Sequence, residues 1–375
     1  MHEISTAATD IGAVEKSSAQ RQSSSSSSIR AAVIGATGFT GVELVSILTA
    51  HPVFTLAVAT ARCDAGQHLS DLYPALAGSG ADILLTPLEE FDPASADVVF
   101  LAVPHTSAMG LAPKLLEAGI KVIDLSADFR IKDASVYQQW YGVEHTAPPL
   151  LDQAVYALPE LTSHEAIENT QLLSCPGCYP TATALAAAPL VASSLARVGT
   201  PLIVDAKSGV SGAGRKASEV THFCTVAESV HAYRVGTHQH TPEIEQILSG
   251  SASRAINVSF TPHLVPMKRG LLSTVHIACQ EDAAAETVHA LYLDAYRGEP
   301  FVSILPLGQQ PKTSEVTGTN HARIGIGFDA RTHIATVTCA IDNLGKGASS
   351  QAVQVANISY GLDQATGLGH FRSIV

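Results

Sequence analysis

Short apolar runs alternate with longer mixed stretches through the first half of the chain. The predicted strands are residues 31–34, 54–59, 97–103 and 121–125. Between them, apolar residues at helical spacing predict helices at 42–50 and 107–118. Regular alternation of strand and helix indicates the α/β class, with a doubly wound parallel sheet.

The second half has a different pattern, which predicts a separate α+β domain. Its predicted strands are residues 201–207, 256–260 and 271–279, followed by a helix at 286–296. A long loop is predicted at 128–151, where aromatic residues and prolines interrupt the periodicity. A last helix, at 348–358, follows a turn and is expected to pack back on the first domain.

A glycine-spaced turn joins the first predicted strand to the first predicted helix. It has the sequence Gly35-Ala36-Thr37-Gly38-Phe39-Thr40-Gly41. Glycines let the backbone approach a pyrophosphate, and the N-terminus of the following helix faces its negative charge. We therefore predict a Rossmann-type dinucleotide-binding domain, with cofactor contacts from Gly35, Thr37, Gly38, Phe39, Thr40 and Gly41. An ordinary tight turn between strand and helix is the alternative.

The end of the second predicted strand bears on which dinucleotide is used. Folds that bind NAD usually place an acidic residue there, on the ribose hydroxyls, whereas this chain has Thr60-Ala61-Arg62. A hydroxyl and a guanidinium suit the 2′-phosphate of NADP, which an acid would repel. Arg62 therefore predicts NADP(H), and a solvated surface arginine is the alternative.

These patterns divide the chain into three regions. Residues 1–29 form a serine-rich polar tail, which we expect to be disordered. The tail lacks the basic-then-apolar order of a secretory signal, and a transit peptide is the alternative that its acidic residues oppose. Residues 30–177 together with 343–375 are predicted to form the dinucleotide-binding domain. Residues 178–342 are predicted to form a catalytic and oligomerisation domain.

Composition limits the classes of partner. The formal net charge is −12, which disfavours nucleic acid and anionic membrane surfaces as main partners. No apolar run is long enough to predict a membrane span. The six cysteines are scattered along 375 residues and do not form the dense framework of a secreted protein. We therefore expect a globular cytoplasmic protein that acts on a small molecule.

The most informative stretch is Ser174-Cys175-Pro176-Gly177-Cys178-Tyr179-Pro180, which leads into an alanine-rich helical run. Proline suits the first turn of a helix, so Cys178 is predicted to lie at a helix N-terminus. Unpaired N–H groups and the helix dipole favour a thiolate there, and a thiolate is the nucleophilic form of sulfur. A buried structural cysteine, or a redox pair formed with Cys175, is the alternative.

Two histidines lie just before another predicted helix, in Thr237-His238-Gln239-His240-Thr241-Pro242. A histidine beside a thiol can activate the sulfur and move protons. His240 is our first choice for this role and His238 the second, a choice that the sequence alone leaves open. A zinc site and surface histidines are the alternatives; we predict no metal.

Two segments carry cations suited to an anionic substrate. One ends a strand and contains Ser126 and Arg130, and the other is a glycine-rich turn that ends in Arg215 and Lys216. Arginine binds carboxylate and phosphate groups with two parallel hydrogen bonds. Either segment is equally typical of a solvated loop. A dinucleotide fold combined with a thiol and a histidine indicates oxidoreduction of an aldehyde or an acyl phosphate.

From residue 29 onward, these motifs in this order resemble the N-acetyl-gamma-glutamyl-phosphate reductase family of arginine biosynthesis, which is related to aspartate-semialdehyde dehydrogenases. The resemblance also covers Tyr156-Ala157-Leu158-Pro159-Glu160, Val265-Pro266-Met267-Lys268-Arg269-Gly270 and Asp342-Asn343-Leu344. It implies that Cys178 attacks the acyl phosphate and forms a thioester, which NADPH reduces to the semialdehyde. The resemblance also implies a histidine acid and base, Asn343 at the cofactor, and a homodimer or homotetramer.

Three positions depart from the pattern expected of this family. Cys175 replaces a small or polar residue, Gln239 replaces an arginine, and Gln67 replaces a lysine after Arg62. Cys175 raises the hypothesis of a reversible disulfide with Cys178. A semialdehyde dehydrogenase that acts on a related amino-acid acyl phosphate is the nearest rival function.

Overall fold

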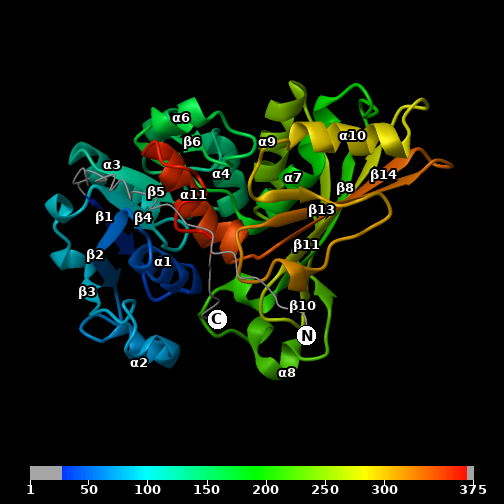
Figure 1. The fold of residues 1–375 in the computed structure, drawn as a ribbon. Coiled ribbons are helices and arrows are strands. Elements are labelled where there is room, and N and C mark those ends of the chain that lie inside the picture. The colour runs from blue at the N-terminus through cyan, green and yellow to red at the C-terminus, as the bar shows by residue number, and fades with distance from the viewer. Residues whose placement is uncertain (1–27, 370–375) are drawn as a thin grey trace, which may run out of the picture.

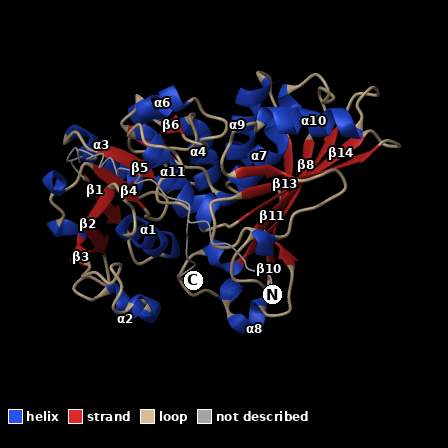
Figure 2. Ribbon diagram, viewed as in Figure 1, coloured by secondary structure: helices blue, strands red, loops and turns tan. Residues whose placement is uncertain are grey.

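The computed structural model describes residues 28–369, which form two β-sheets side by side with helices packed on them (Figures 1 and 2). Most of the tail predicted at 1–29 lies outside the described residues. The α/β fold class with a second α+β unit is confirmed. Within the described residues, no helix is long and apolar enough to cross a membrane.

The first sheet is entirely parallel, with strand order β3-β2-β1-β4-β5-β7-β6. Its order runs outward from β1, through β2 and β3 on one side and through β4 and β5 on the other, which is the arrangement of doubly wound folds. The strands are β1 (Ile29–Ile34), β2 (Phe54–Ala61), β3 (Thr86–Pro87), β4 (Val98–Leu101), β5 (Lys121–Asp124), β6 (Val155–Tyr156) and β7 (Leu172–Ser174).

Helices cover both faces of this sheet, which explains its continuous apolar strands. In β1, Ala31 and Val33 pack into the core beneath α1 and α11, while Ala32 and Ile34 pack beneath α3 on the other face. The helices of this half are α1 (Phe39–Thr49), α2 (Leu69–Leu72), α3 (Ala108–Glu117), α4 (Ala134–Tyr141), α5 (Pro149–Gln153), α6 (His164–Glu168) and α11 (Ser350–Ser359).

The second sheet is mixed, with strand order β12-β13-β14-β11-β8-β10-β9. Its strands are β8 (Leu202–Gly209), β9 (His231–Ala232), β10 (Val258–Val265), β11 (Leu271–Ala278), β12 (Val302–Ile304), β13 (Ala322–Asp329) and β14 (Ile334–Ile341). The helices of this half are α7 (Cys178–Ala192), α8 (Phe223–Val226), α9 (Thr241–Ala252) and α10 (Ala285–Ala295).

Within the described residues, helices α7, α9 and α10 cover one face of the second sheet and leave most of the other face open (Figure 1). Alternate residues of β8, such as Leu202 and Val204, are buried beneath α7, α9 and α10. The residues between them face the other way, and Ile203 is 45% exposed. The same alternation of buried and part-exposed residues runs through β10 and β11. The second sheet therefore presents an open, mostly polar face.

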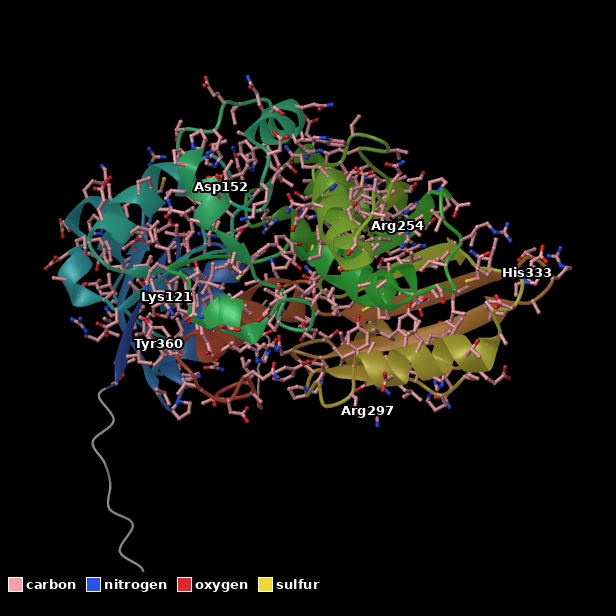
Figure 3. The ribbon with its side chains drawn as sticks, turned by 90° about the horizontal axis from the view of Figure 1, so that it is seen from above. Lys121, Asp152, Arg254, Arg297, His333 and Tyr360 are labelled. Carbon is pink, nitrogen blue, oxygen red and sulfur yellow. The ribbon has the colours of Figure 1, made fainter. Side chains whose placement is uncertain are left out.

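The last helix returns to the first half, as the sequence predicted. The chain leaves β14 through a π-helix, Gly345–Ser349, and α11 then packs in the core of the first sheet. Lys121 of β5 donates to the carbonyl of Ser359 over 2.7 Å and lies 4.9 Å from the ring centre of Tyr360 (Figure 3). These contacts fix the end of α11 against the start of β5.

Two predictions about elements are wrong. The segment predicted as a loop at 128–151 contains α4 and α5, since Asp133 caps α4 by accepting from Ser135 and Val136. Strands β12, β13 and β14 were not predicted. The hairpin of β13 and β14 reaches the far tip of the molecule near His333 (Figure 3). In β13, glycines Gly325 and Gly327 weaken the strand pattern that sequence reasoning depends on.

The glycine turn is packed too closely for any other residue at its last position. A Cβ on Gly41 would overlap the carbonyl oxygen of Gly35 and lie 2.7 Å from the Ala36 Cα. Both are backbone atoms, so neither can move without distorting β1 or α1. The close approach lets the first turn of α1 face the ligand side of the sheet.

We predict that Gly41→Ala lowers the free energy of unfolding by about 1–3 kcal/mol, which is typical of overpacking. The matched control is Gly110→Ala in α3, where a Cβ has nothing within 4 Å. This control should raise stability by about 0.5–1 kcal/mol, since alanine reduces the freedom of the unfolded chain. Urea denaturation measures both, and equal effects would contradict the packing argument.

Candidate active site

Cys178 occupies the position that the sequence predicted. Strand β7 ends at Ser174, the chain turns through Cys175 to Gly177, and Cys178 is the first residue of α7. Gly177 is the N-cap with extended backbone angles, φ −69° and ψ 161°, and Pro180 lies in the first turn. The helix therefore begins at the thiol.

Three separate segments converge on this turn. A Cβ on Gly177 would overlap the ring of His240 and come within 2.9 Å of Arg130 Nη1. A Cβ on Gly347, in the π-helix, would lie 2.7 Å from the Cys178 Cβ. Glycine at both positions allows the strand-end arginine, the histidine segment and the C-terminal π-helix to meet around Cys178.

The surroundings of the Cys178 thiol favour its protonated form. Burial raises the pKa of Cys178 to about 11, although the N–H groups of Tyr179 and Cys178 and the charge of Arg130 lower it. The predicted position at a helix N-terminus is thus confirmed, but the expected thiolate is not. Loss of hydration at a buried sulfur outweighs the dipole of one helix end.

The two histidines have different surroundings. His238 is surrounded by Tyr179, Tyr233 and Phe260, with ring centres 5.3–5.7 Å away, and its Nδ1 accepts from the backbone N–H of His240. Burial lowers its pKa to about 4. His240 lies against Gly177 instead, and its buried Nδ1 has no hydrogen-bond partner within the described residues.

His240 is also uncharged. Burial lowers its pKa well below the ordinary value, and the nearby His238, Arg130 and Arg234 lower it further. A neutral imidazole has a free lone pair, so it can accept a proton. The ligand-free site therefore combines a neutral thiol with a neutral imidazole.

A buried ion pair fixes the geometry of the turn. Arg130 donates from Nε to the carbonyl of Cys175 over 2.8 Å, from Nη2 to that of Leu125 over 2.8 Å, and from Nη1 to Glu243 Oε2 over 3.5 Å. Burial lowers the pKa of Arg130, but the charge of Glu243 raises it overall. All three nitrogens of this guanidinium thus have partners in the protein.

Glu243, in the first turn of α9, is a residue that sequence reasoning did not single out. Its Oε1 accepts from the backbone N–H of Gly177 over 2.8 Å and from the hydroxyl of Tyr156 over 2.9 Å. Its side chain is fully buried, and burial raises its pKa. An acidic residue among the apolar positions of a predicted helix was the available signal.

Arg234 is a second residue that sequence reasoning missed. Its backbone has φ +45°, unusual for a residue other than glycine, and its Nη1 donates to Gln239 Oε1 over 3.0 Å. Gln239 lies between the two histidines, so this exposed guanidinium is fixed beside them. The structure thus places a guanidinium beside position 239, where the family pattern has an arginine.

The predicted cofactor loop has the features that a pyrophosphate requires. It joins β1 to α1, and the first turn of α1 leaves the N–H groups of Phe39, Thr40 and Gly41 without partners inside the helix. A Cβ at Gly38 would meet only the Gly35 carbonyl oxygen, at 3.8 Å, so the approach is open. Gly35 has φ +90°, which a side chain would strain. These residues fit a dinucleotide phosphate.

The other predicted ligand contacts lie in varied surroundings. Arg62 is exposed just beyond β2. Ser126 donates to Asp124 within a buried turn, and Asn343 accepts from the Gly270 N–H while donating to Ser211. Arg215 contacts the cofactor loop through the Thr37 carbonyl, over 3.3 Å, whereas the neighbouring Lys216 is exposed.

The geometry argues against a disulfide between Cys175 and Cys178. Both thiols are free, Cys175 is packed in the core of the first sheet, and Cys178 packs against the core of the second. The two side chains thus point into different halves of the molecule. Burial also raises the pKa of Cys175, which makes it a poor nucleophile.

Comparison with known protein families gives two matches that together span most of the chain. The semialdehyde dehydrogenase NAD binding domain matches residues 30–170. The semialdehyde dehydrogenase dimerisation domain matches residues 178–343.

Curated relatives are similar along almost their whole length. N-acetyl-gamma-glutamyl-phosphate reductase of Symbiobacterium thermophilum is 48% identical over 341 residues, which cover 91% of this chain and 97% of the relative. Reductases of the same name from Desulforudis audaxviator and Ectopseudomonas mendocina are 47% and 45% identical, each over 91% of this chain and 98% of the relative.

Solved structures with lower sequence identity share the fold. Aspartate semialdehyde dehydrogenase II of Vibrio cholerae, complexed with ASA, has a TM-score of 0.69 at 19% identity, over 89% of this chain and 98% of that one. Aspartate semialdehyde dehydrogenase of Candida albicans, with NADP, has a TM-score of 0.65 at 17% identity, over 88% and 98%.

The protonation of Cys178 gives a prediction about its alkylation by iodoacetamide. Because the thiol pKa is about 11, the rate in the ligand-free protein should rise about tenfold per pH unit between pH 7 and 9. Glu243→Gln should increase the rate at pH 8, since the charge of Glu243 raises this pKa while Arg130 lowers it.

Mass spectrometry of the Cys178 peptide measures the reaction separately from the exposed Cys63 and Cys224. The matched control is Glu245→Gln, on the same helix, where the side chain accepts from the Val258 N–H. A rate that reaches a plateau below pH 9 in the unsubstituted protein would contradict the neutral thiol.

Proposed function

The chain belongs to the N-acetyl-gamma-glutamyl-phosphate reductase family, and we propose that it reduces N-acetyl-gamma-glutamyl phosphate to N-acetyl-glutamate 5-semialdehyde, with release of phosphate, in arginine biosynthesis. The curated relatives, at 45–48% identity over 91% of this chain, confirm the resemblance that the sequence motifs predicted. The observation that carries the proposal is that His240 and the Arg130–Glu243 pair meet at the turn that precedes Cys178.

The first step in this proposal is attack by Cys178. Its Sγ forms a bond to the acyl carbon while the thiol proton passes to the neutral imidazole of His240, and the bond to the phosphate oxygen breaks. Phosphate leaves, and a thioester on Cys178 remains. We assign this role to His240 because its ring lies against Gly177, whereas His238 is enclosed by aromatic side chains.

The second step resolves the thioester. The nicotinamide cofactor, when bound, supplies a hydride to the acyl carbon. Protonated His240 then stabilises the oxygen of the resulting hemithioacetal. As that group collapses, the bond between carbon and Sγ breaks, the aldehyde leaves, and the proton returns from His240 to the sulfur of Cys178. Glycine at position 177 leaves room for the His240 ring against the residue that precedes Cys178.

We propose NADP(H) as the cofactor. The glycine loop and the match to an NAD binding domain support a nicotinamide dinucleotide. Exposed Arg62 just beyond β2 supports the 2′-phosphorylated form. The rival substrate class, a related amino-acid acyl phosphate, is supported by fold similarity to aspartate semialdehyde dehydrogenases alone.

We also propose a homodimer or homotetramer that forms through the open face of the second sheet. The match to a dimerisation domain covers this sheet, and Ile203 lies exposed on that face. Light scattering in solution would give the number of copies, and a monomer would contradict the proposal. Six unpaired cysteines support a cytoplasmic location.

The assay that tests the function runs in the reverse direction. Phosphate-dependent reduction of NADP⁺ with N-acetyl-glutamate semialdehyde should be measurable, and Cys178→Ser should abolish it. Exposed Cys63→Ser is the matched control and should keep full activity. Equal activity of Cys178→Ser would refute the thioester, and a preference for aspartate semialdehyde would favour the rival substrate class.

We propose that Arg234 contacts an anionic group of the substrate, because it is exposed beside the histidines while all three nitrogens of Arg130 have partners. Arg234→Gln should raise the KM for either phosphate or the semialdehyde by about tenfold or more, since a charge-assisted hydrogen bond is lost. An increase in the KM for phosphate would place Arg234 at the acyl phosphate, and an increase in the KM for semialdehyde at the carboxylate. Unchanged values for both would contradict the role.

A further inference from the structure

Arg215 belongs to the second half of the chain, but its side chain contacts residues of the first half. It follows β8 and a short helical turn of the second half, Val210–Ala213, which Gly214 ends with φ +84°. Its Nη1 nevertheless lies 3.1 Å from Asp64 Oδ2 and 3.3 Å from the Thr37 carbonyl oxygen, both in the first half. The side chain thus crosses from one half of the molecule to the cofactor loop of the other.

The contacts of Arg215 mark the position of the adenosine ribose. In doubly wound folds the pyrophosphate lies on the glycine loop, and the ribose of the adenosine lies beyond the end of the second strand. Thr37 belongs to that loop, and Asp64 follows the end of β2 by three residues. A guanidinium that bonds to both therefore lies beside the 2′ position of the ribose.

The surroundings orient Arg215 and leave part of its guanidinium available. Its Cζ lies 5.8 Å from the ring centre of Tyr73, whose hydroxyl donates to the same Thr37 carbonyl over 3.0 Å. Within residues 28–369, both hydrogen bonds of Arg215 involve Nη1, and the side chain is 38% exposed. Nε and Nη2 therefore remain for an oxyanion, with the plane of the group already fixed.

Asp64 gives the pair a second effect on cofactor choice. A free carboxylate beyond the second strand would accept hydrogen bonds from ribose hydroxyls and repel a 2′-phosphate. Here the carboxylate faces the positive charge of Arg215. The arginine therefore adds an attraction for the phosphate and also neutralises the acid that would oppose it.

We propose that Arg215 determines the preference for NADP(H) over NAD(H): its guanidinium binds the 2′-phosphate from the second half of the molecule and neutralises Asp64. This role replaces the substrate contact predicted for Arg215, and it rests on the proposed use of NADP(H). One phosphate group then bridges the two halves of the protein, with Arg62 on one side and Arg215 on the other.

The test compares binding of 2′,5′-ADP and 5′-AMP, which differ only in the 2′-phosphate, by calorimetry on the full chain. Arg215→Ala should weaken binding of 2′,5′-ADP about 10- to 100-fold and change that of 5′-AMP less than about threefold. Adding Asp64→Asn to this variant should restore part of the lost affinity, because the unpaired acid is removed. The matched control is Arg297→Ala, an exposed arginine just after α10 that pairs with Asp294, which should change neither.

The outcomes separate this inference from the proposed function. If the unsubstituted protein does not distinguish the two nucleotides, the NADP(H) preference fails, and the role of Arg215 fails with it. If the unsubstituted protein prefers 2′,5′-ADP but Arg215→Ala keeps that preference, only the role of Arg215 is overturned. Equal losses for both nucleotides would show that Arg215 merely supports the loop. Thermal unfolding of each variant verifies that it is folded.

Discussion

The buried ion pair between Arg130 and Glu243 is the interaction on which the candidate site depends. Arg130 follows β5 in the first half, Glu243 lies in α9 of the second half, and both hold backbone groups of the turn before Cys178. Removing one partner of a buried pair typically costs about 3–5 kcal/mol, because the other charge is left without compensation. The position of the nucleophile is thus fixed by both halves at once.

The same pair determines the charge that the site can tolerate. Burial is the main cause that raises the pKa of Cys178, while the charge of Arg130 lowers this pKa and the charge of Glu243 raises it, so the two partners act on the sulfur in opposite directions. The thiol stays neutral until a base next to it accepts the proton. His240, neutral for the same reason of burial, is such a base. A thiol of this kind resists oxidation and alkylation between turnovers, since reactivity follows the thiolate form.

The fold and the position of the nucleophile could be predicted because their causes are local. In the cofactor loop, the apolar strand, the glycine turn and the beginning of the helix follow one another within a few residues. Gly177, Cys178 and Pro180 are equally close together in the sequence. The partner of Arg130 lies 113 residues away, and no spacing rule connects the two. The thiol pKa also depends on burial by distant segments, which raises it, whereas a rule based on one helix end considers only the effect that lowers it.

A second buried ionic group connects the cofactor loop to the nucleophile. Glu43, on α1 just after the glycine turn, pairs with Arg269, and Arg269 also donates from Nε to Asp342 over 3.0 Å. The carbonyl of Asp342 accepts from the N–H of Gly347, the residue that packs on the Cys178 Cβ. All three charged side chains are almost completely buried, so displacing any of them leaves an uncompensated charge in a low dielectric. The helix that follows the glycine turn and the segment that packs on Cys178 are therefore connected through one buried network of charges and backbone contacts.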